Sequence, residues 1–183
     1  MKLRIGISVA PCRRWMRASP AFFLATATHL ALAGVVLGSW LAPAVSAATD
    51  PAIERDLVAL TNVDRTSNGL SSLIEESVLV EIGRERSADM VARNYFSHDI
   101  PPDGEKVFAI MDRRRVPFES AGENLAWNNA GVSATVQHAE KDFMNSPTHR
   151  ANIMRGAFTH IGVGAEIGTD KTMFTVLFMK PFD

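Results

Sequence analysis

Cysteine is almost absent from this chain, whose 183 residues include a single one, Cys12. A lone cysteine excludes an intramolecular disulfide, so the folded part of the chain must be stabilised by a hydrophobic core. About 135 residues follow the N-terminal segment described next, which is enough for one domain with such a core. That part contains no internal repeat and no low-complexity segment.

Acidic residues are absent before Asp50. The stretch that precedes it opens with basic residues, namely Lys2, Arg4, Arg13, Arg14 and Arg17. An apolar run over residues 21–42 follows, and small residues over 45–48 end it. This order is typical of a secretory signal peptide. We therefore predict a signal peptide over residues 1–47, cleaved after Ala47 or Ala48, and a folded domain over residues 48–183.

This prediction places the mature protein outside the cytoplasm, secreted or periplasmic. The alternative is an uncleaved membrane anchor, because the apolar run is about long enough to span a bilayer. The small residues over 45–48 favour cleavage, after which no stable membrane span is expected. The pair Arg13-Arg14 hints at twin-arginine export, and the export route stays open.

A positive net charge is missing from the predicted mature domain. All 20 acidic residues lie from Asp50 onward, whereas 5 of the 19 lysines and arginines lie before it. The mature domain therefore carries 14 basic and 20 acidic residues, a net charge of −6. General nucleic-acid binding needs a basic face, so this class of partner is not expected.

Apolar residues at helical spacing predict helices through most of the domain. The first helix has its apolar face at Ile53, Leu57, Leu60 and Val63. Ser77 and Ser146 are each predicted to cap the helix that follows, with the Ser146 hydroxyl bound to the helix backbone. The predicted helices run over residues 51–68, 78–93, 107–115, 132–143 and 147–154, and an irregular loop covers 94–104.

In the C-terminal part of the chain, the spacing of apolar residues changes from that of a helix to that of a strand. Apolar residues alternate with Gly162, Gly164 and Glu166 over residues 161–167, which predicts a strand whose glycines allow close packing. A turn over 168–171 leads to residues 173–179, which are apolar on both faces, as in a fully buried strand. Helices on both faces of a mixed or antiparallel sheet would satisfy this pattern.

Three short fragments carry groups that bind metals or move protons. They lie at residues 96–98, 121–126 and 145–150, and their reactive groups are His98, Glu123 and His149. These residues are about 25 positions apart, unlike a short zinc signature such as H-E-x-x-H, so spacing alone identifies no metal site. Only tertiary folding can bring them together.

These fragments and their neighbours resemble the CAP superfamily of cysteine-rich secretory, antigen 5 and pathogenesis-related 1 proteins, and especially its cysteine-free bacterial members. The likeness runs from Ile53 to Phe182. It rests on ordered blocks: Asn62-x-x-Arg65, Leu70-x-x-Leu73, Ala88-Asp89-Met90, Tyr95-Phe96-Ser97-His98, Gly122-Glu123-Asn124-Leu125-Ala126, Ser146-Pro147-Thr148-His149-Arg150-x-Asn152-Ile153 and His160-Ile161-Gly162-Val163-Gly164. The resemblance implies an α+β fold, a three-layer α-β-α sandwich, with a groove that holds a tetrad of histidines and glutamates.

Three tetrad positions match His98, Glu123 and His149. The fourth does not, because Ser146 stands where the family's larger members place a glutamate, and Phe143 stands where they place a tryptophan. Bacterial members commonly show this change, so it leaves the family resemblance intact. It weakens any mechanism that needs two carboxylates.

Two neutral imidazoles and a carboxylate would hold a divalent metal such as zinc, with an open position for water. In this hypothesis His98, His149 and Glu123 are the ligands, or Glu123 instead acts catalytically as a general base. Ser146 and Asn124 are predicted to line the ligand groove. A serine-hydrolase triad of Ser146, His149 and Glu123 is disfavoured, because no nucleophile-elbow motif surrounds the serine.

Structural roles are expected for the other polar residues. His138 and Glu140 are expected to be exposed on their helix, and residues 113–115 to form a solvated helix end. His160 is expected to be partly buried on its strand.

Together these features predict an exported binding module, with a groove for a small apolar molecule such as a lipid, a glycan or a peptide. The alternative is a metal-dependent extracellular hydrolase, a protease or nuclease, in which Glu123 activates water. A third reading is a structural domain in which His98, Glu123 and His149 form a hydrogen-bonded brace. A fold that supports several functions does not choose among these.

Overall fold

The computed structural model describes residues 49–182. The predicted signal peptide over residues 1–47, its cleavage and the alternative anchor lie outside the described residues and stay predictions. Within residues 49–182, no helix has both the length and the apolar character needed to cross a membrane.

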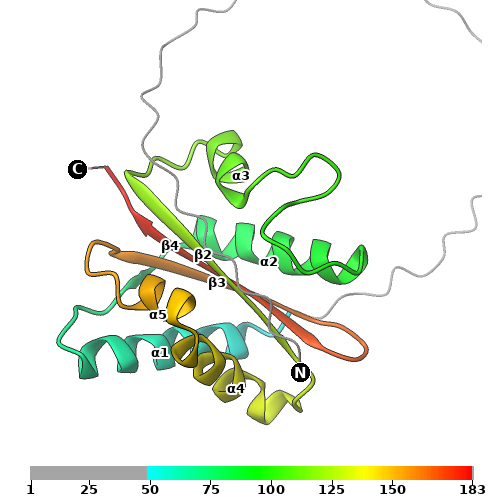
Figure 1. Ribbon diagram of the computed structural model, residues 1–183, viewed down its shortest axis with the longest axis horizontal. Helices are drawn as coiled ribbons and strands as arrows, with labels where there is room; N and C mark the ends of the chain where they lie inside the picture. Colours follow the sequence, from blue (N-terminus) through cyan, green and yellow to red (C-terminus); the bar gives the residue numbers. More distant parts are fainter. Residues whose placement is uncertain (1–48, 183) are drawn as a thin grey trace, which may run out of the picture. The chain divides into compact units, whose positions relative to one another are not determined.

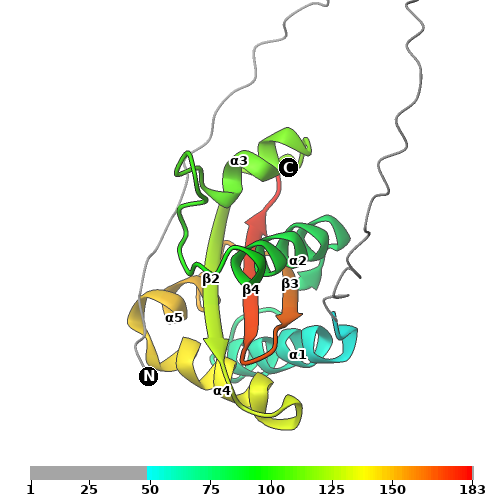
Figure 2. The same cartoon turned by 90° about the vertical axis from the view of Figure 1, so that its right-hand side faces the viewer.

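A mixed four-stranded sheet crosses the middle of the described domain. Its strands are β1 (Ile74–Glu75), β2 (Ser120–Asn128), β3 (His160–Ile167) and β4 (Thr172–Lys180). Their order is β1-β3-β4-β2, so β1 and β2 are the edge strands. Figure 2 shows β2, β4 and β3 in this sheet. β3 pairs antiparallel with β4 as the predicted hairpin, β2 pairs antiparallel with β4, and β1 pairs parallel with β3.

Helices cover both faces of this sheet (Figure 1). They are α1 (Pro51–Ser67), α2 (Ser77–Ala92), α3 (Val107–Arg113), α4 (Val132–Asn145) and α5 (Pro147–Ile153). α2 and α3 lie on one face, and α1, α4 and α5 lie on the other. The predicted α+β class and three-layer α-β-α sandwich are therefore confirmed.

α1 begins and ends where the sequence predicts. The Asp50 side chain accepts a hydrogen bond from the Ala52 N–H at 2.9 Å, and Pro51 occupies the first turn, where its missing N–H costs no hydrogen bond. The chain leaves the helix through Gly69, whose φ is +76°. Glycine adopts this left-handed conformation without the clash that a Cβ would cause.

The last turns of α1 bury an arginine where an apolar residue was expected. Val63 is 58% exposed, so its predicted place on the apolar face is wrong, whereas Arg65 is 1% exposed. The Arg65 guanidinium donates hydrogen bonds to the carbonyls of Ser71, Ile153, Arg155 and Phe158. A guanidinium carries five N–H donors, so one side chain binds α1 to the segments that precede β1 and β3.

Two core layers lie on opposite faces of the sheet, because successive strand residues point in opposite directions. Val163 and Val176 pack with α1 and α4 on one face. Leu177 and Met179 pack with α2 and α3 on the other. The apolar run over 173–179 is therefore buried on both sides, as predicted.

The sequence pattern does not predict β1 or β2. β2 reads Ser-Ala-Gly-Glu-Asn-Leu-Ala-Trp-Asn and has no β-branched residue, so its propensity favours no strand. It pairs with β4 along its whole length, from Ser120 opposite Lys180 to Asn128 opposite Thr172. Tertiary pairing thus decides its conformation, and β1, with two residues, is too short to show a period.

Several helix ends differ from the prediction. Ser77 is the first residue of α2 and not its cap, since Glu76 takes the capping position without a side-chain hydrogen bond. α3 ends at Arg113, and Arg115 leaves the helical conformation with a φ of +58°. Residues 113–115 are exposed, as expected.

Gly162 and Gly164 bring α2 into backbone contact with β3. A Cβ atom on Gly164 would lie 1.9 Å from the Arg84 nitrogen and 2.0 Å from the Gly83 carbonyl carbon. A Cβ on Gly162 would lie 2.3 Å from the Leu79 Cβ. Cβ atoms essentially never approach other atoms within 3.0 Å, so any side chain here would push the helix off the strand. The predicted close packing is confirmed.

Glu140 is buried between α4 and α1, so its predicted exposure is wrong. Its Oε2 accepts a hydrogen bond from the Thr61 hydroxyl at 2.9 Å. Burial, together with the nearby carboxylate of Asp64, raises the pKa of Glu140 to about 8 although the Thr61 bond opposes the shift. Periodicity placed this residue at the border of the apolar stripe, and α1 covers that border. His138 is exposed and His160 half-buried, as expected.

We expect Gly164→Ala to lower the free energy of unfolding by about 3 kcal/mol or more, because the added methyl group overlaps backbone atoms of α2 that cannot rotate away. Urea unfolding followed by circular dichroism measures the change. Gly156→Ala is the matched control, since its Cβ would lie 3.6 Å from the Leu70 Cδ2, an ordinary contact. Its effect should stay within about 0.5 kcal/mol. Equal stability of Gly164→Ala and wild type would contradict the backbone contact.

Glu140 should make the domain less stable as the pH rises. The folded protein holds its proton up to a pH of about 8, whereas the ordinary pKa is 4.5, so the folded state binds more protons between these values. Relative to Glu140→Gln, we expect the wild type to lose up to about 1.4 kcal/mol per pH unit over this range. Urea unfolding of both proteins at several pH values measures the difference. Parallel stability curves would show that Glu140 does not titrate in this way.

Candidate functional site

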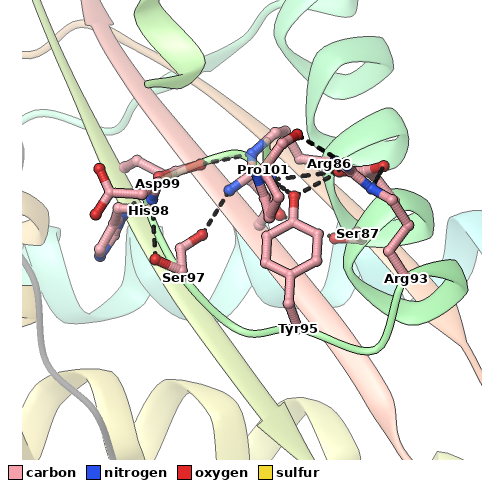
Figure 3. Close-up of polar contacts among 11 residues, drawn as sticks. Arg86, Ser87, Arg93, Tyr95, Ser97, His98, Asp99 and Pro101 are labelled. Atoms are coloured by element: carbon pink, nitrogen blue, oxygen red, sulfur yellow. Dashed lines mark hydrogen bonds and ion pairs between the residues drawn. The ribbon is translucent and has the colours of Figure 1, made fainter. Parts of the chain in front are cut away.

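A loop that follows α2 places His98. The Tyr95 hydroxyl donates a hydrogen bond to Asp89 of α2 at 2.5 Å. The Ser97 hydroxyl accepts one from the Asp99 N–H at 3.0 Å, a local turn that serine stabilises. These contacts hold the loop on both sides of His98 (Figure 3).

His98 and Glu123 form a direct pair, with 2.5 Å between Nδ1 and Oε2. Glu123 projects from β2 and its side chain is 1% exposed, whereas the His98 side chain is 12% exposed. A carboxylate that accepts the Nδ1 proton fixes the tautomer and the orientation of an imidazole. In that tautomer Nε2 carries a lone pair, and within the described residues it accepts no hydrogen bond.

A buried arginine completes this pair. Arg86 lies in α2 with its side chain 1% exposed, and its Nε donates to Glu123 Oε1 at 3.3 Å. Its Nη2 donates to the Ser97 carbonyl at 2.8 Å, and its Nη1 donates to the Tyr95 hydroxyl at 2.5 Å (Figure 3). One guanidinium therefore binds both the carboxylate and the loop that carries His98.

Sequence reasoning missed Arg86, although its position carried a signal. It falls among Leu79, Ile82 and Met90 on the buried face of α2. A charged residue within an apolar stripe is costly unless it is paired. An arginine at such a position therefore indicates buried hydrogen-bond acceptors, which for Arg86 include the carboxylate of Glu123.

His149 lies in α5 and is 1% exposed. Its ring meets the Phe143 ring edge-on, with 5.3 Å between centroids. Within residues 49–182 neither ring nitrogen has a hydrogen-bond partner. Burial, and then the charge of nearby His98, lower the pKa of His149 to about 4. The imidazole is therefore neutral at neutral pH, and its two buried nitrogens are unpaired within the described residues.

Asn124 holds α5 against β2. Its Nδ2 donates to the His149 carbonyl at 3.0 Å, and its Oδ1 accepts from the Asn152 amide at 2.8 Å. The side chain is 0% exposed. Asn124, predicted to line a ligand groove, therefore supports His149 from inside the protein.

Ser146 takes the capping position of α5, but its hydroxyl makes no hydrogen bond with the helix backbone. The predicted capping bond is wrong, because the Ser146 Oγ lies instead 3.1 Å from the Thr148 Oγ1. Ser146 is 3% exposed and Phe143 1%. The place of the missing carboxylate is thus filled by a short buried hydroxyl.

The five predicted site residues are not all in contact with one another. His98 and Glu123 are in contact, and His149 is near enough for the charge of His98 to affect it. Asn124 and Ser146 are both buried, and Asn124 binds the His149 carbonyl. Among the five, His98 is the residue with the greatest exposure.

The metal hypothesis requires His98, Glu123 and His149 to direct donors at one point. In the part of the chain that the structure describes, no group of three or more His, Cys, Asp or Glu side chains is arranged in this way. Glu123 uses one oxygen for His98 and the other for Arg86. This donor set does not fit a divalent metal as it stands. A metal such as zinc stays a prediction, and no step of the function proposed below depends on it.

A three-layer α-β-α sandwich with a histidine–glutamate pair at its edge strand defines the class of domain that the sequence resembles. The model of the cysteine-rich secretory protein family, CAP, matches residues 58–178. The chain therefore belongs to the CAP family, and the resemblance is confirmed.

Two known proteins that match this sequence are longer than the segment that matches it. The sequence is 39% identical to YkwD, an uncharacterized protein of Bacillus subtilis strain 168, over 113 residues, which are 62% of this chain and 42% of YkwD. It is 34% identical over 130 residues to YlbC, an uncharacterized membrane protein of the same strain, covering 69% of this chain and 34% of YlbC. The chain thus spans less than half the length of these relatives.

Solved structures share the fold. The crystal structure of an extracellular protein containing an SCP domain from Bacillus anthracis strain Ames has a TM-score of 0.63 and 29% identity, covering 72% of this chain and 41% of that one. An outer surface protein from Borrelia burgdorferi has a TM-score of 0.66 and 17% identity, covering 74% of this chain and 99% of that one. The second likeness is one of fold alone.

We expect Asn124→Leu to lower the free energy of unfolding by about 2–4 kcal/mol, because the Asn152 amide and the His149 carbonyl each lose a buried partner. Asn129→Leu, at an exposed asparagine of the same region, should change stability by no more than about 0.5 kcal/mol. Urea unfolding measures both. Wild-type stability in Asn124→Leu would mean that packing alone holds α5.

Proposed function

We propose that the chain is an extracellular binding module of the CAP family, and that its ligand contacts His98. The observation that carries this proposal is the 2.5 Å contact between His98 and Glu123, which orients the ring and leaves Nε2 without a hydrogen-bond partner among residues 49–182. His98 is 12% exposed, whereas Glu123 and His149 are each 1% exposed. A ligand therefore meets His98 first.

Two observations support a place outside the cytoplasm. The N-terminal sequence has the order of a secretory signal peptide. The chain is also similar to a Bacillus anthracis protein described as extracellular. Export of the domain is part of the proposal.

The chemistry of the site favours a polar ligand. When the Nδ1 proton is the only one on the His98 ring, Nε2 accepts a hydrogen bond from an O–H or N–H group, and when Nε2 also carries a proton it donates one to an oxygen. A glycan or a peptide carries such groups, whereas the core of a lipid does not. The charge of Glu123 is compensated by Arg86, so the pair itself does not require a charged ligand.

A metal-dependent extracellular hydrolase, a protease or nuclease, is the second candidate function. The unpaired nitrogens of His149 favour it, because neutral imidazole is a common metal ligand. Glu123 suits the general-base role less well, since it is 1% exposed and both its oxygens are engaged. Turnover of peptide or nucleic-acid probes that a chelator abolishes would favour this candidate.

Calorimetric titration with three probes tests the binding proposal: chitotetraose for a glycan, tetra-alanine for a peptide and palmitate for an apolar molecule. We expect a polar probe to bind, and His98→Ala to weaken its binding about three- to tenfold, the effect of one hydrogen bond. His138→Ala, at an exposed histidine outside the site, should leave the affinity unchanged. Binding of palmitate alone, or equal affinity in His98→Ala, would contradict the proposal.

A further inference from the structure

We propose that Arg86 is the resident cation of this site: its guanidinium neutralises Glu123 in place of a divalent metal and keeps the carboxylate out of metal coordination. The inference concerns the site of the proposed function, but it holds whether or not His98 receives a ligand. It agrees with the geometry of the described domain, in which His98 contacts Glu123 but no group of three His, Cys, Asp or Glu side chains could hold a metal.

Glu123 is a buried carboxylate that needs a compensating charge. Its side chain is 1% exposed, and an ionised carboxylate in such surroundings is strongly destabilised unless it is paired. Arg86, also 1% exposed, supplies the charge through its Nε, 3.3 Å from Oε1. A guanidinium is weakly hydrated and presents its donors in a plane, so it is well suited to a buried pair with a carboxylate.

Neighbouring groups hold the guanidinium in place. Its other nitrogens donate to the Ser97 carbonyl at 2.8 Å and to the Tyr95 hydroxyl at 2.5 Å. Tyr95 in turn donates to Asp89, whose carboxylate lies 4.0 Å from the Arg86 Nη1. Figure 3 shows this chain of contacts, which runs from α2 to the loop of His98. Arg86 is therefore a positioning residue with little freedom to move away from Glu123.

A divalent metal on Glu123 would meet this guanidinium at close range. Like charges repel more strongly in a buried site than in water. The metal would also have to displace Arg86 from Oε1 or His98 from Oε2. Without Glu123, His98 and His149 supply two imidazoles, fewer than the three protein ligands of a catalytic zinc site. Arg86 thus opposes coordination by its contact and by its charge.

Zinc titration of the full chain by calorimetry tests this role in wild type, Arg86→Gln and Arg86→Lys. We expect weak binding by the wild type and at least about tenfold tighter binding by Arg86→Gln, which removes the charge and frees Oε1. Arg86→Lys keeps the charge and should stay within about threefold of wild type. If Arg86 had only a structural role, Arg86→Gln would not bind zinc more tightly than Arg86→Lys.

The gain in Arg86→Gln should vanish when Glu123→Gln is added, because the new ligand is Glu123. Micromolar or tighter zinc binding by the wild type, or no gain in Arg86→Gln, overturns the proposal. If circular dichroism shows that Arg86→Gln does not fold, zinc binding is compared between wild type and Glu123→Gln instead. Equally weak zinc binding by these two proteins supports the proposal, because Glu123 is then no ligand. A lower zinc affinity of Glu123→Gln overturns it. None of these outcomes depends on glycan or peptide binding. A failure of this proposal can therefore be told apart from a failure of the proposed function.

Discussion

The backbone contact between α2 and β3 determines where the rest of the domain lies. Gly83 and Gly164 meet with no side chain between them, so the helix rests directly on the sheet. Ser87, one turn further along α2, donates to the Gly164 carbonyl at 2.9 Å. Because α2 lies this close to the sheet, the Arg86 side chain reaches the carboxylate of Glu123 on β2, two strands away from β3. A helix held at the usual side-chain distance would leave that carboxylate without its cation.

Two buried arginines perform a task that disulfides perform in many secreted proteins. Arg65 binds carbonyls of α5 and of the segment after it, which lie 88 to 93 positions away in the sequence. Arg86 binds a carboxylate 37 positions away. Each joins several segments at once, because a guanidinium has five donors in a fixed plane. The described domain contains no cysteine, and these contacts are among its polar cross-links between distant segments.

The sequence predicts what periodicity and local chemistry control. The helices, the β3–β4 hairpin and the close packing at Gly162 and Gly164 follow from spacing and from the absence of a Cβ. β2 escaped prediction because pairing with β4 makes it a strand, and Glu140 was placed in solvent because α1 covers it only after folding.

The candidate site could also be predicted only in part from the sequence. His98 and Glu123 came from the family resemblance, and the structure places them in contact. Their partner Arg86 did not, since sequence reasoning assigns arginines to the surface unless their place in an apolar stripe is noticed.

β2 carries one further consequence. Glu123 and Asn124 are neighbours in the chain, yet one contacts α2 and the other contacts α5 on the opposite face, because strand residues alternate. A single residue inserted or deleted upstream in this strand would reverse their faces, turning the amide to the face of α2 and the carboxylate to the face of α5. Homologues that keep this site can therefore vary the side chains of β2, but they cannot vary its residue count by one.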